Sequence, residues 1–202
     1  MAKVDRRRAR GADTRQQILD AAREALVEHG FTGTTTRSVA ERAGVRGSLV
    51  HYHFGGKQQL LAAVLDRENL RLLSRQDALF AGPLPLAERW RTACGYLRED
   101  IESGYVRILW ELWAVGLGDD RLAAHWRDAI AGWRELLMRA AAEWADASDL
   151  ELPLPPRALA TLVVSAFLGA EAEILAGVDE QEAPHLDALE RFAELIEWME
   201  RR

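Results

Sequence analysis

The sequence predicts an all-α protein of about nine helices, with a three-helix N-terminal head and a larger helical C-terminal domain. Apolar residues recur at helical spacing along the chain, and no segment shows the alternation that is typical of a β-strand. Glycine and proline separate the helical segments, and the clearest break is the run AGPLP at residues 81–85. The boundary between the two parts is therefore expected near residue 81.

The composition is that of a folded, soluble protein with an uneven distribution of charge. Of 202 residues, 49% are apolar and 29% are charged, and the net charge is −6. Residues 1–60 hold 11 Lys and Arg against 6 Asp and Glu, a net of +5, whereas the remaining 142 residues hold 15 against 26, a net of −11. A basic head on an acidic body is typical of a DNA-binding domain joined to a regulatory one.

The sequence predicts neither export, nor membrane insertion, nor catalysis. The sole cysteine, Cys94, excludes an intramolecular disulfide and fits a reducing compartment. No apolar run approaches membrane-spanning length, and no apolar segment follows the basic N-terminus, so we expect a cytoplasmic protein. His51 and His53 diverge by about 160° around a helix, and the other histidines are isolated in the sequence. We therefore predict no metal site, no cofactor and no enzyme.

The chain begins with a basic arm at residues 1–12. Its cationic side chains are Lys3, Arg6, Arg7, Arg8 and Arg10. The arm is either a solvated tail or a segment that lies along DNA phosphates or in the minor groove, and the sequence leaves both alternatives open. A first helix is expected from about Thr14 to His29, with Gly30 as its end.

Residues 34–60 predict two short helices joined by a tight turn, followed at once by the start of another helix. Thr35 is the best N-cap of the first short helix, because its hydroxyl can accept an unpaired amide proton of the first turn. Gly44 lies where the chain must turn, since glycine adopts the left-handed conformation without steric cost. Val50 and Phe54 then face inward on the second short helix.

The outer face of the second short helix carries small, hydroxylated and aromatic side chains. Ser48 and Tyr52 point away from the predicted core, flanked by Leu49 and His51, and Arg46 precedes the helix. Such a face is what the second helix of a helix-turn-helix presents to the major groove of DNA. Residues 13–60 are therefore expected to form a helix-turn-helix DNA-binding domain.

The run AGVRGSLVHYHFGGKQQLL, residues 43–61, resembles the signature of the TetR (tetracycline-repressor) family of transcriptional regulators. Tyr52, His53, Phe54 and Lys57 match the aromatic, histidine, phenylalanine and lysine positions of that pattern. The segment TTTRSVA at residues 34–40 matches the upstream part. The resemblance covers about the first third of the chain and implies binding to a double-stranded DNA operator.

Several residues of the groove-facing helix depart from the family's usual pattern. Arg46, Gly47, Ser48 and His51 are the departures, and they concern the operator sequence rather than the fold. We expect Arg46 to be the best candidate for a guanine edge. The complete set of expected DNA contacts is Thr35, Thr36, Arg37, Arg46, Gly47, Ser48, Leu49, His51, Tyr52, His53 and Lys57.

A fourth helix is expected from Lys57 to about residue 79, bridging to a ligand-binding and dimerisation domain at residues 81–202. Five further helices are predicted at about residues 86–102, 105–116, 121–145, 156–176 and 185–200.

All seven tryptophans lie after residue 80. They either pack the core and an interface or line a pocket for a small, largely apolar or aromatic effector of unknown identity. Trp110 and Trp113, three residues apart, are the best candidates for such a pocket. The expected ligand-binding set is Arg107, Trp110, Glu111, Trp113, His125, Trp126, Trp133 and Phe167.

The last two predicted helices carry apolar stripes wide enough to cover a core on one side and a partner on the other. The resemblance implies a four-helix interface of a homodimer, and a two-fold dimer would space two recognition helices about 34–36 Å apart or more. The expected interface residues are Leu159, Leu162, Val163, Ala166, Phe167, Ala170, Ile174, Leu189, Phe192 and Ile196.

The sequence thus predicts a homodimeric, ligand-responsive repressor of a palindromic operator. Two alternatives stay open. One is an activator or architectural DNA-binding protein without an effector. The other is an all-α small-molecule binder or enzyme whose helix-turn-helix no longer binds DNA, against which Arg37, Arg46 and Lys57 argue.

Overall fold

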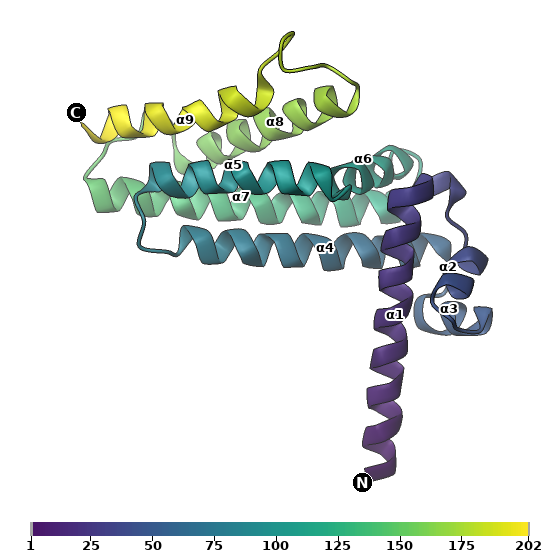
Figure 1. Cartoon of the computed structure of the whole chain (residues 1–202). Coiled ribbons are helices and arrows are strands. Elements are labelled where there is room, and N and C mark those ends of the chain that lie inside the picture. The colour runs from purple at the N-terminus through teal and green to yellow at the C-terminus, as the bar shows by residue number, and fades with distance from the viewer. Residues whose placement is uncertain (1, 202) are drawn as a thin grey trace. The chain divides into compact units, whose positions relative to one another are not determined.

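The structure is a computed structural model that describes residues 2–201, and of residues 2–10 it describes the backbone alone. This part of the chain forms nine α-helices and no strand, so the predicted all-α fold is confirmed. The helices are α1 (Ala2–Gly33), α2 (Thr36–Arg42), α3 (Gly47–Phe54), α4 (Lys57–Phe80), α5 (Leu86–Glu102), α6 (Tyr105–Gly116), α7 (Asp120–Ser148), α8 (Pro156–Leu175) and α9 (His185–Glu200) (Figure 1).

The observed helix ends agree with the predicted ones except at the N-terminus. The ends of α5, α6 and α9 are those predicted, and those of α4, α7 and α8 differ by a few residues. The first helix begins at Ala2 instead of near Thr14, and Gly30, with φ 67°, interrupts it where its end was predicted. The basic side chains of the predicted arm lie outside the described residues.

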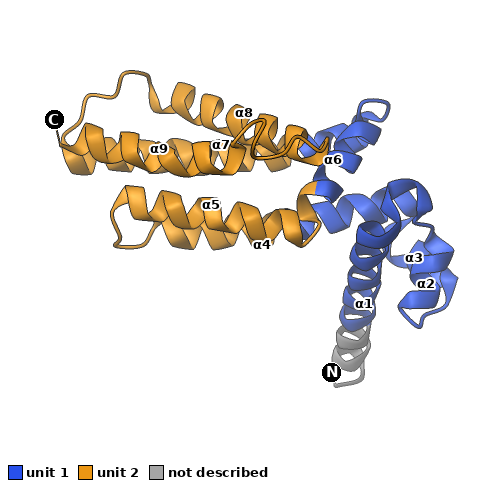
Figure 2. Cartoon of the chain, turned by 45° about the horizontal axis from the view of Figure 1, so that its top comes forward, with its two compact units in different colours: residues 1–68, 107–126 blue, residues 69–106, 127–202 orange. Residues whose placement is uncertain are grey.

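The chain folds into two compact units (Figure 2). Unit 1 comprises the chain up to Glu68 together with Arg107–Trp126, and unit 2 comprises Asn69–Val106 together with the chain from Arg127 onward. Helices α4, α6 and α7 therefore each contribute residues to both units. This division differs from the expected boundary near residue 81, because most of α6 packs into the core of unit 1.

The core of unit 1 joins helices that are far apart in the sequence. Each large apolar side chain buried in such a core contributes about 1.5–3 kcal/mol. The buried residues include Ile18, Ala22 and Leu26 of α1, Val39 and Ala40 of α2, Val50 and Phe54 of α3, Leu61 and Val64 of α4, and Ile108, Leu109 and Leu112 of α6. Helix α6 thus closes the core on which the predicted helix-turn-helix lies.

The core of unit 2 is built mainly by α5, α7 and α9. Its buried residues include Trp90 and Cys94 of α5, Leu136, Ala140 and Trp144 of α7, and Ala193 and Ile196 of α9. Figure 1 shows that the axes of these three helices lie roughly parallel or antiparallel to one another. The indole N–H groups of Trp90 and Trp144 donate to the Leu189 carbonyl oxygen (2.6 Å) and to Glu200 Oε1 (2.8 Å).

Helix α8 is unusually apolar for a helix at the surface. Its buried residues are Ala160, Val164 and Ala170, whereas Leu162 is 58% exposed. By length and composition alone, α8 could cross a membrane. This corrects the expectation that no apolar run approaches that length. An exposed apolar face of this kind is characteristic of an interaction surface.

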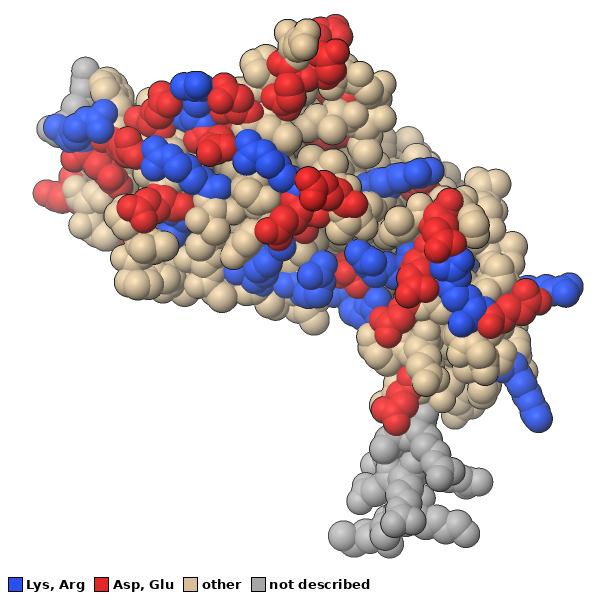
Figure 3. All heavy atoms as spheres, in the orientation of Figure 1, with Lys and Arg blue, Asp and Glu red and all other residues tan. Residues whose placement is uncertain are grey.

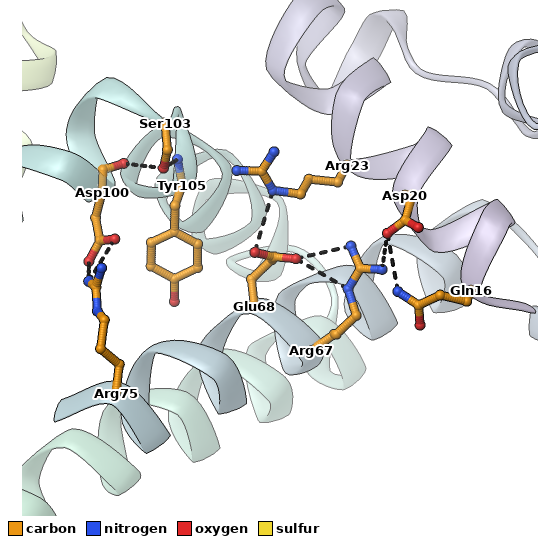
Figure 4. Close-up of polar contacts among 9 residues, drawn as sticks. All are labelled: Gln16, Asp20, Arg23, Arg67, Glu68, Arg75, Asp100, Ser103 and Tyr105. Atoms are coloured by element: carbon orange, nitrogen blue, oxygen red, sulfur yellow. Dashed lines mark hydrogen bonds and ion pairs between the residues drawn. The ribbon is translucent and has the colours of Figure 1, made fainter. Parts of the chain in front are cut away.

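A buried carboxylate joins α1 to α4 within unit 1 (Figure 4). Glu68 is 5% exposed, and its Oε1 accepts hydrogen bonds from Nε (3.2 Å) and Nη2 (3.0 Å) of Arg67. Its Oε2 lies 3.4 Å from Nε of Arg23 on α1. Arg67 also donates to Asp20 (2.6 Å), which accepts a second bond from Gln16 (3.1 Å). The network fixes how α4 lies against α1.

A second ion pair, within unit 2, joins α4 to α5. Nη2 of Arg75 donates to both carboxylate oxygens of Asp100, at 3.0 and 2.8 Å (Figure 4). Burial raises the pKa of Asp100, and the Arg75 guanidinium opposes that shift. The same guanidinium lies 4.0 Å from the ring centroid of Tyr96. Two residues of α5, Asp100 and Tyr96, therefore hold the Arg75 side chain.

We expect Glu68→Ala to lower the free energy of unfolding by about 1–3 kcal/mol, because two guanidinium groups lose a buried acceptor. The control is Glu41→Ala, which removes an exposed i,i+4 partner of Arg37 and should leave the free energy of unfolding nearly unchanged. Urea unfolding followed by circular dichroism measures both. Equal losses in the two variants would contradict a structural role for Glu68.

Candidate nucleic-acid interface

The first short helix of the helix-turn-helix begins with a capping box. Oγ1 of Thr35 accepts the backbone N–H of Ser38 (3.0 Å), and Oγ of Ser38 accepts the backbone N–H of Thr35 (3.0 Å). The predicted N-cap is therefore confirmed, and Ser38 is the partner that the sequence reading missed. The two bonds satisfy amides that the helix leaves unpaired. They fix the start of α2.

The turn between α2 and α3 has the predicted glycine in the left-handed conformation. Gly44 has φ 65°, and a Cβ built there would meet nothing within 4 Å. The backbone conformation alone therefore favours glycine at this position. The N–H of Val45 donates to the Ala40 carbonyl oxygen (3.0 Å), which closes the turn before α3 begins at Gly47.

Helix α3 has one buried face and one exposed face. Val50 and Phe54 are buried in the core of unit 1, as predicted. Ser48, His51 and Tyr52 are exposed, and Tyr52 retains 80% of its accessible surface. An exposed tyrosine of this kind, on a helix whose sequence contains no acidic residue, is suited to contact a polyanion.

Two other α3 residues from the predicted DNA-binding set are half-buried. Leu49 packs against the core of unit 1, and His53 stacks edge-on against Tyr52 with ring centroids 5.0 Å apart. Nδ1 of the exposed His51 lies 3.3 Å from the Gly55 carbonyl oxygen. The roles of these side chains on DNA stay predictions.

The arginines around α3 differ in how they are paired. Arg46 is exposed and makes no ion pair with any residue that the structure describes. Arg37 is paired with Glu41 (2.9 Å), and Arg42 donates to Glu28 (2.8 Å). Arg46 can therefore approach DNA without first leaving a carboxylate, unlike Arg37 and Arg42. On the face drawn in Figure 3, basic side chains project singly at the end that carries α2 and α3.

Two cations lie over aromatic rings of unit 1. Nζ of Lys57 is 4.3 Å from the ring centroid of Phe31, and burial lowers the pKa of this lysine. The guanidinium of Arg15 is 5.0 Å from the ring centroid of Phe54. The sequence reading missed Arg15, although its position three residues before the buried Ile18 places it beside the inner stripe of α1.

The eight predicted ligand-binding residues are divided between the two units. Most of them belong to unit 1, where the Trp113 ring packs edge-on against Trp110 and at a tilt against Trp126, with ring centroids 5.1 and 6.0 Å apart. His125 lies 2.9 Å from Asp66 within the same unit. These tryptophans thus pack against one another, and Trp126 also packs against the core of unit 1.

Glu111 and Arg107 of the predicted set also lie in unit 1, where Nε of Arg107 donates to Glu111 (2.8 Å). Trp133 and Phe167 belong to unit 2. Nε1 of Trp133 donates to Asn69 (3.0 Å), and the ring of Phe167 lies 5.7 Å from that of Trp90.

Unit 2 contains an apolar cavity of about 220 Å³. None of the eight predicted ligand-binding residues lines it. The sequence reading missed this site because its residues occupy ordinary apolar positions of several helix ends and of the loop before α8. The lining residues are Phe80, Leu86, Trp90, Leu137, Ala140, Ala141, Trp144, Leu152, Pro153, Leu159, Ala160, Val163, Phe192, Leu195, Ile196 and Met199.

The described residues offer no cluster of three His, Cys, Asp or Glu that could hold a metal ion. Cys94 is buried in unit 2, and burial raises the pKa of its thiol to about 12. The thiol therefore stays protonated near neutral pH, where only the thiolate is a strong nucleophile.

Comparison with known proteins identifies relatives of the N-terminal half. Residues 18–64 match the family described as bacterial regulatory proteins, tetR family. The HTH-type transcriptional regulator SrpR of Pseudomonas putida is 44% identical over 98 residues, which cover 47% of this chain and 43% of SrpR. TtgW, an HTH-type transcriptional regulator of the same species, is also 44% identical over 98 residues, which cover 47% of this chain and 68% of TtgW.

Solved structures resemble the whole chain. A TetR-family regulator from Rhodococcus sp. has a TM-score of 0.76 at 21% identity, over 92% of this chain and 98% of that one. FadR of Bacillus subtilis, solved with stearoyl-CoA, has a TM-score of 0.70 at 17% identity, over 90% and 96%. SmeT, solved with triclosan, has a TM-score of 0.63 at 22% identity, over 93% and 90%. At these identities the likeness concerns the fold.

Proposed function

This chain belongs to the TetR family of bacterial regulatory proteins, and from that premise we propose that it is a ligand-responsive transcriptional repressor. It binds a palindromic operator as a homodimer and is released by a small, largely apolar or aromatic effector. The exposed face of α3 is the observation that carries the proposal. It combines Tyr52 with Arg46, the N-cap residue that makes no ion pair within the described part of the chain, on a surface whose inner side is fixed in a core.

In this proposal α3 enters the major groove. The guanidinium of Arg46 offers two donors that match the O6 and N7 acceptors of guanine. Ser48 and Tyr52 lie on the same exposed surface, near enough to reach bases or the adjoining backbone. Arg37 and Lys57 bind phosphates, and Arg37 exchanges Glu41 for a phosphate at little cost because that pair is exposed.

Helices α8 and α9 form the proposed dimer interface. Leu162 and Leu175 of α8 and Trp198 of α9 are large apolar side chains that remain exposed in a single chain and do not line the unit 2 cavity. A stable interface buries about 1,200–2,000 Å² in total, and the apolar faces of these two helices suit that purpose. Pairing with a second copy also accounts for the apolar composition of α8 in a protein that acts on DNA in the cytoplasm.

The apolar cavity of unit 2 is the proposed effector site, in place of the tryptophan set predicted from the sequence. The indole N–H groups of Trp90 and Trp144, which line the cavity, already have acceptors. A polar ligand group would therefore lack a hydrogen-bond partner there, and the cavity suits an apolar ligand. The complexes of FadR with stearoyl-CoA and of SmeT with triclosan support this, because both proteins share the fold. Differential binding to two conformations is typically worth about 1–3 kcal/mol per site.

Selection of duplexes from a random library tests the proposal. We expect enrichment of a palindrome, and we expect Arg46→Ala to weaken binding by about 1–3 kcal/mol and to relax the preference at one position of each half-site. The control is Arg37→Ala, which should weaken binding about equally for all sequences. If Arg46→Ala weakens binding equally for all sequences, Arg46 contacts a phosphate and not a base. Failure of the library to enrich any sequence would contradict the proposal.

An effector screened by its ability to release the selected operator locates the ligand site. We expect Ala141→Phe, which fills the unit 2 cavity, to abolish release while operator binding persists. Trp110→Phe should leave release unchanged, because Trp110 does not line the cavity. Dose–response curves by fluorescence anisotropy measure both. The reverse pattern would place the effector at the tryptophans of unit 1.

A further inference from the structure

One side chain of α6 binds the connection between α1 and α2. The carboxylate oxygen Oε2 of Glu111 accepts a hydrogen bond from the backbone N–H of Phe31, 80 positions earlier in the chain. The other oxygen, Oε1, accepts from Nε of Arg107 at 2.8 Å. The Glu111 side chain is 26% exposed, so much of it is removed from water. Both residues that Glu111 binds belong to unit 1.

Gly30, the residue before Phe31, leaves room for this carboxylate because it has no side chain. Gly30 has φ 67° and ψ −177°, which interrupts α1 and turns the next N–H toward Glu111. A Cβ at Gly30 would lie 2.9 and 3.0 Å from the two carboxylate oxygens, closer than such atoms pack. Glycine is therefore favoured here both by its backbone conformation and by the proximity of Glu111.

The same connection supports two elements of the proposed DNA-binding surface. The hydroxyl of the buried Thr34 donates to the Gly30 carbonyl oxygen (2.7 Å), and Thr34 directly precedes the N-cap of α2. The ring of Phe31 lies beneath the ammonium group of Lys57, at the start of α4. The position of the Gly30–Phe31 peptide thus influences both the start of α2 and the Lys57 side chain.

We propose that Glu111 is a positioning residue for DNA binding, through the hydrogen bond that its carboxylate accepts from Phe31. This inference rests on the proposed function, because it concerns the same interface with DNA. Glu111 touches no DNA itself. It holds the Gly30–Phe31 peptide so that α2 and Lys57 keep the arrangement that binds the operator. The Arg107 side chain, which is 55% exposed, only orients the Glu111 carboxylate. In this proposal the hydrogen bond from Phe31, and not the ion pair with Arg107, supports DNA binding.

Four single variants test the inference, with affinity for the selected operator measured by fluorescence anisotropy. Glu111→Gln keeps the length and an acceptor oxygen, so it should bind nearly as tightly as the unaltered chain. Glu111→Asp keeps the charge but is one methylene too short, and Glu111→Leu has no acceptor. Both should lose affinity by about 10-fold or more. Arg107→Ala, which removes only the ion pair, should bind within about 3-fold of the unaltered chain.

A second readout separates positioning from general destabilisation. In Glu111→Asp, hydrogen exchange of the Phe31 amide should accelerate, while the core amides of α3 and α6 exchange as before. Retained affinity in both Asp and Leu variants would overturn the inference alone. Affinity that follows charge, kept by Asp and lost by Gln and Arg107→Ala, would overturn it in favour of the ion pair. Absence of sequence-selective binding by the unaltered chain would overturn the proposed function with it.

Discussion

The arrangement of the proposed DNA-binding surface depends on a hydrophobic core that α6, a helix distant in the sequence, completes. Helices α2 and α3 have 7 and 8 residues, too few to be stable by themselves in water. Their inner residues, Val39 and Val50, are buried with Ile108 and Leu112 of α6. The head is therefore not a self-contained three-helix domain. Helix α3 is held in part by residues of α6, which begins at Tyr105.

The cationic side chains of unit 1 differ in whether a carboxylate binds them. Arg23 and Arg67 bind the buried Glu68 and fix α1 against α4, and Arg42 is bound by carboxylates of α1. Arg46 is left facing solvent at the start of α3. Because an exposed guanidinium loses little on leaving water for a phosphate or guanine edge, Arg46 is the arginine proposed to read a base, whereas Arg23, Arg67 and Arg42 hold helices together.

The features predicted well from the sequence are local ones. The Thr35 cap, the Gly44 turn and the ends of α5, α6 and α9 depend on residues within a few positions, which capping and turn chemistry determine. The features that the sequence did not predict concern which residues become neighbours in the fold. Periodicity showed that Trp110 and Trp113 share an apolar side of a helix, but it could not show that they pack in unit 1. The cavity of unit 2 was missed for the same reason, since it exists only where several helix ends meet.

The central claim, that the outer face of α3 contacts the operator, is tested most directly by photo-crosslinking. A photoreactive benzoylphenylalanine in place of Tyr52 should cross-link to the selected duplex. The same group in place of Leu117, which is 73% exposed in unit 1 after α6, serves as the matched control and should not. Strong cross-linking from position 52 alone is the result expected. Cross-linking from position 117 with none from position 52 would contradict the assignment of α3 as the reading helix.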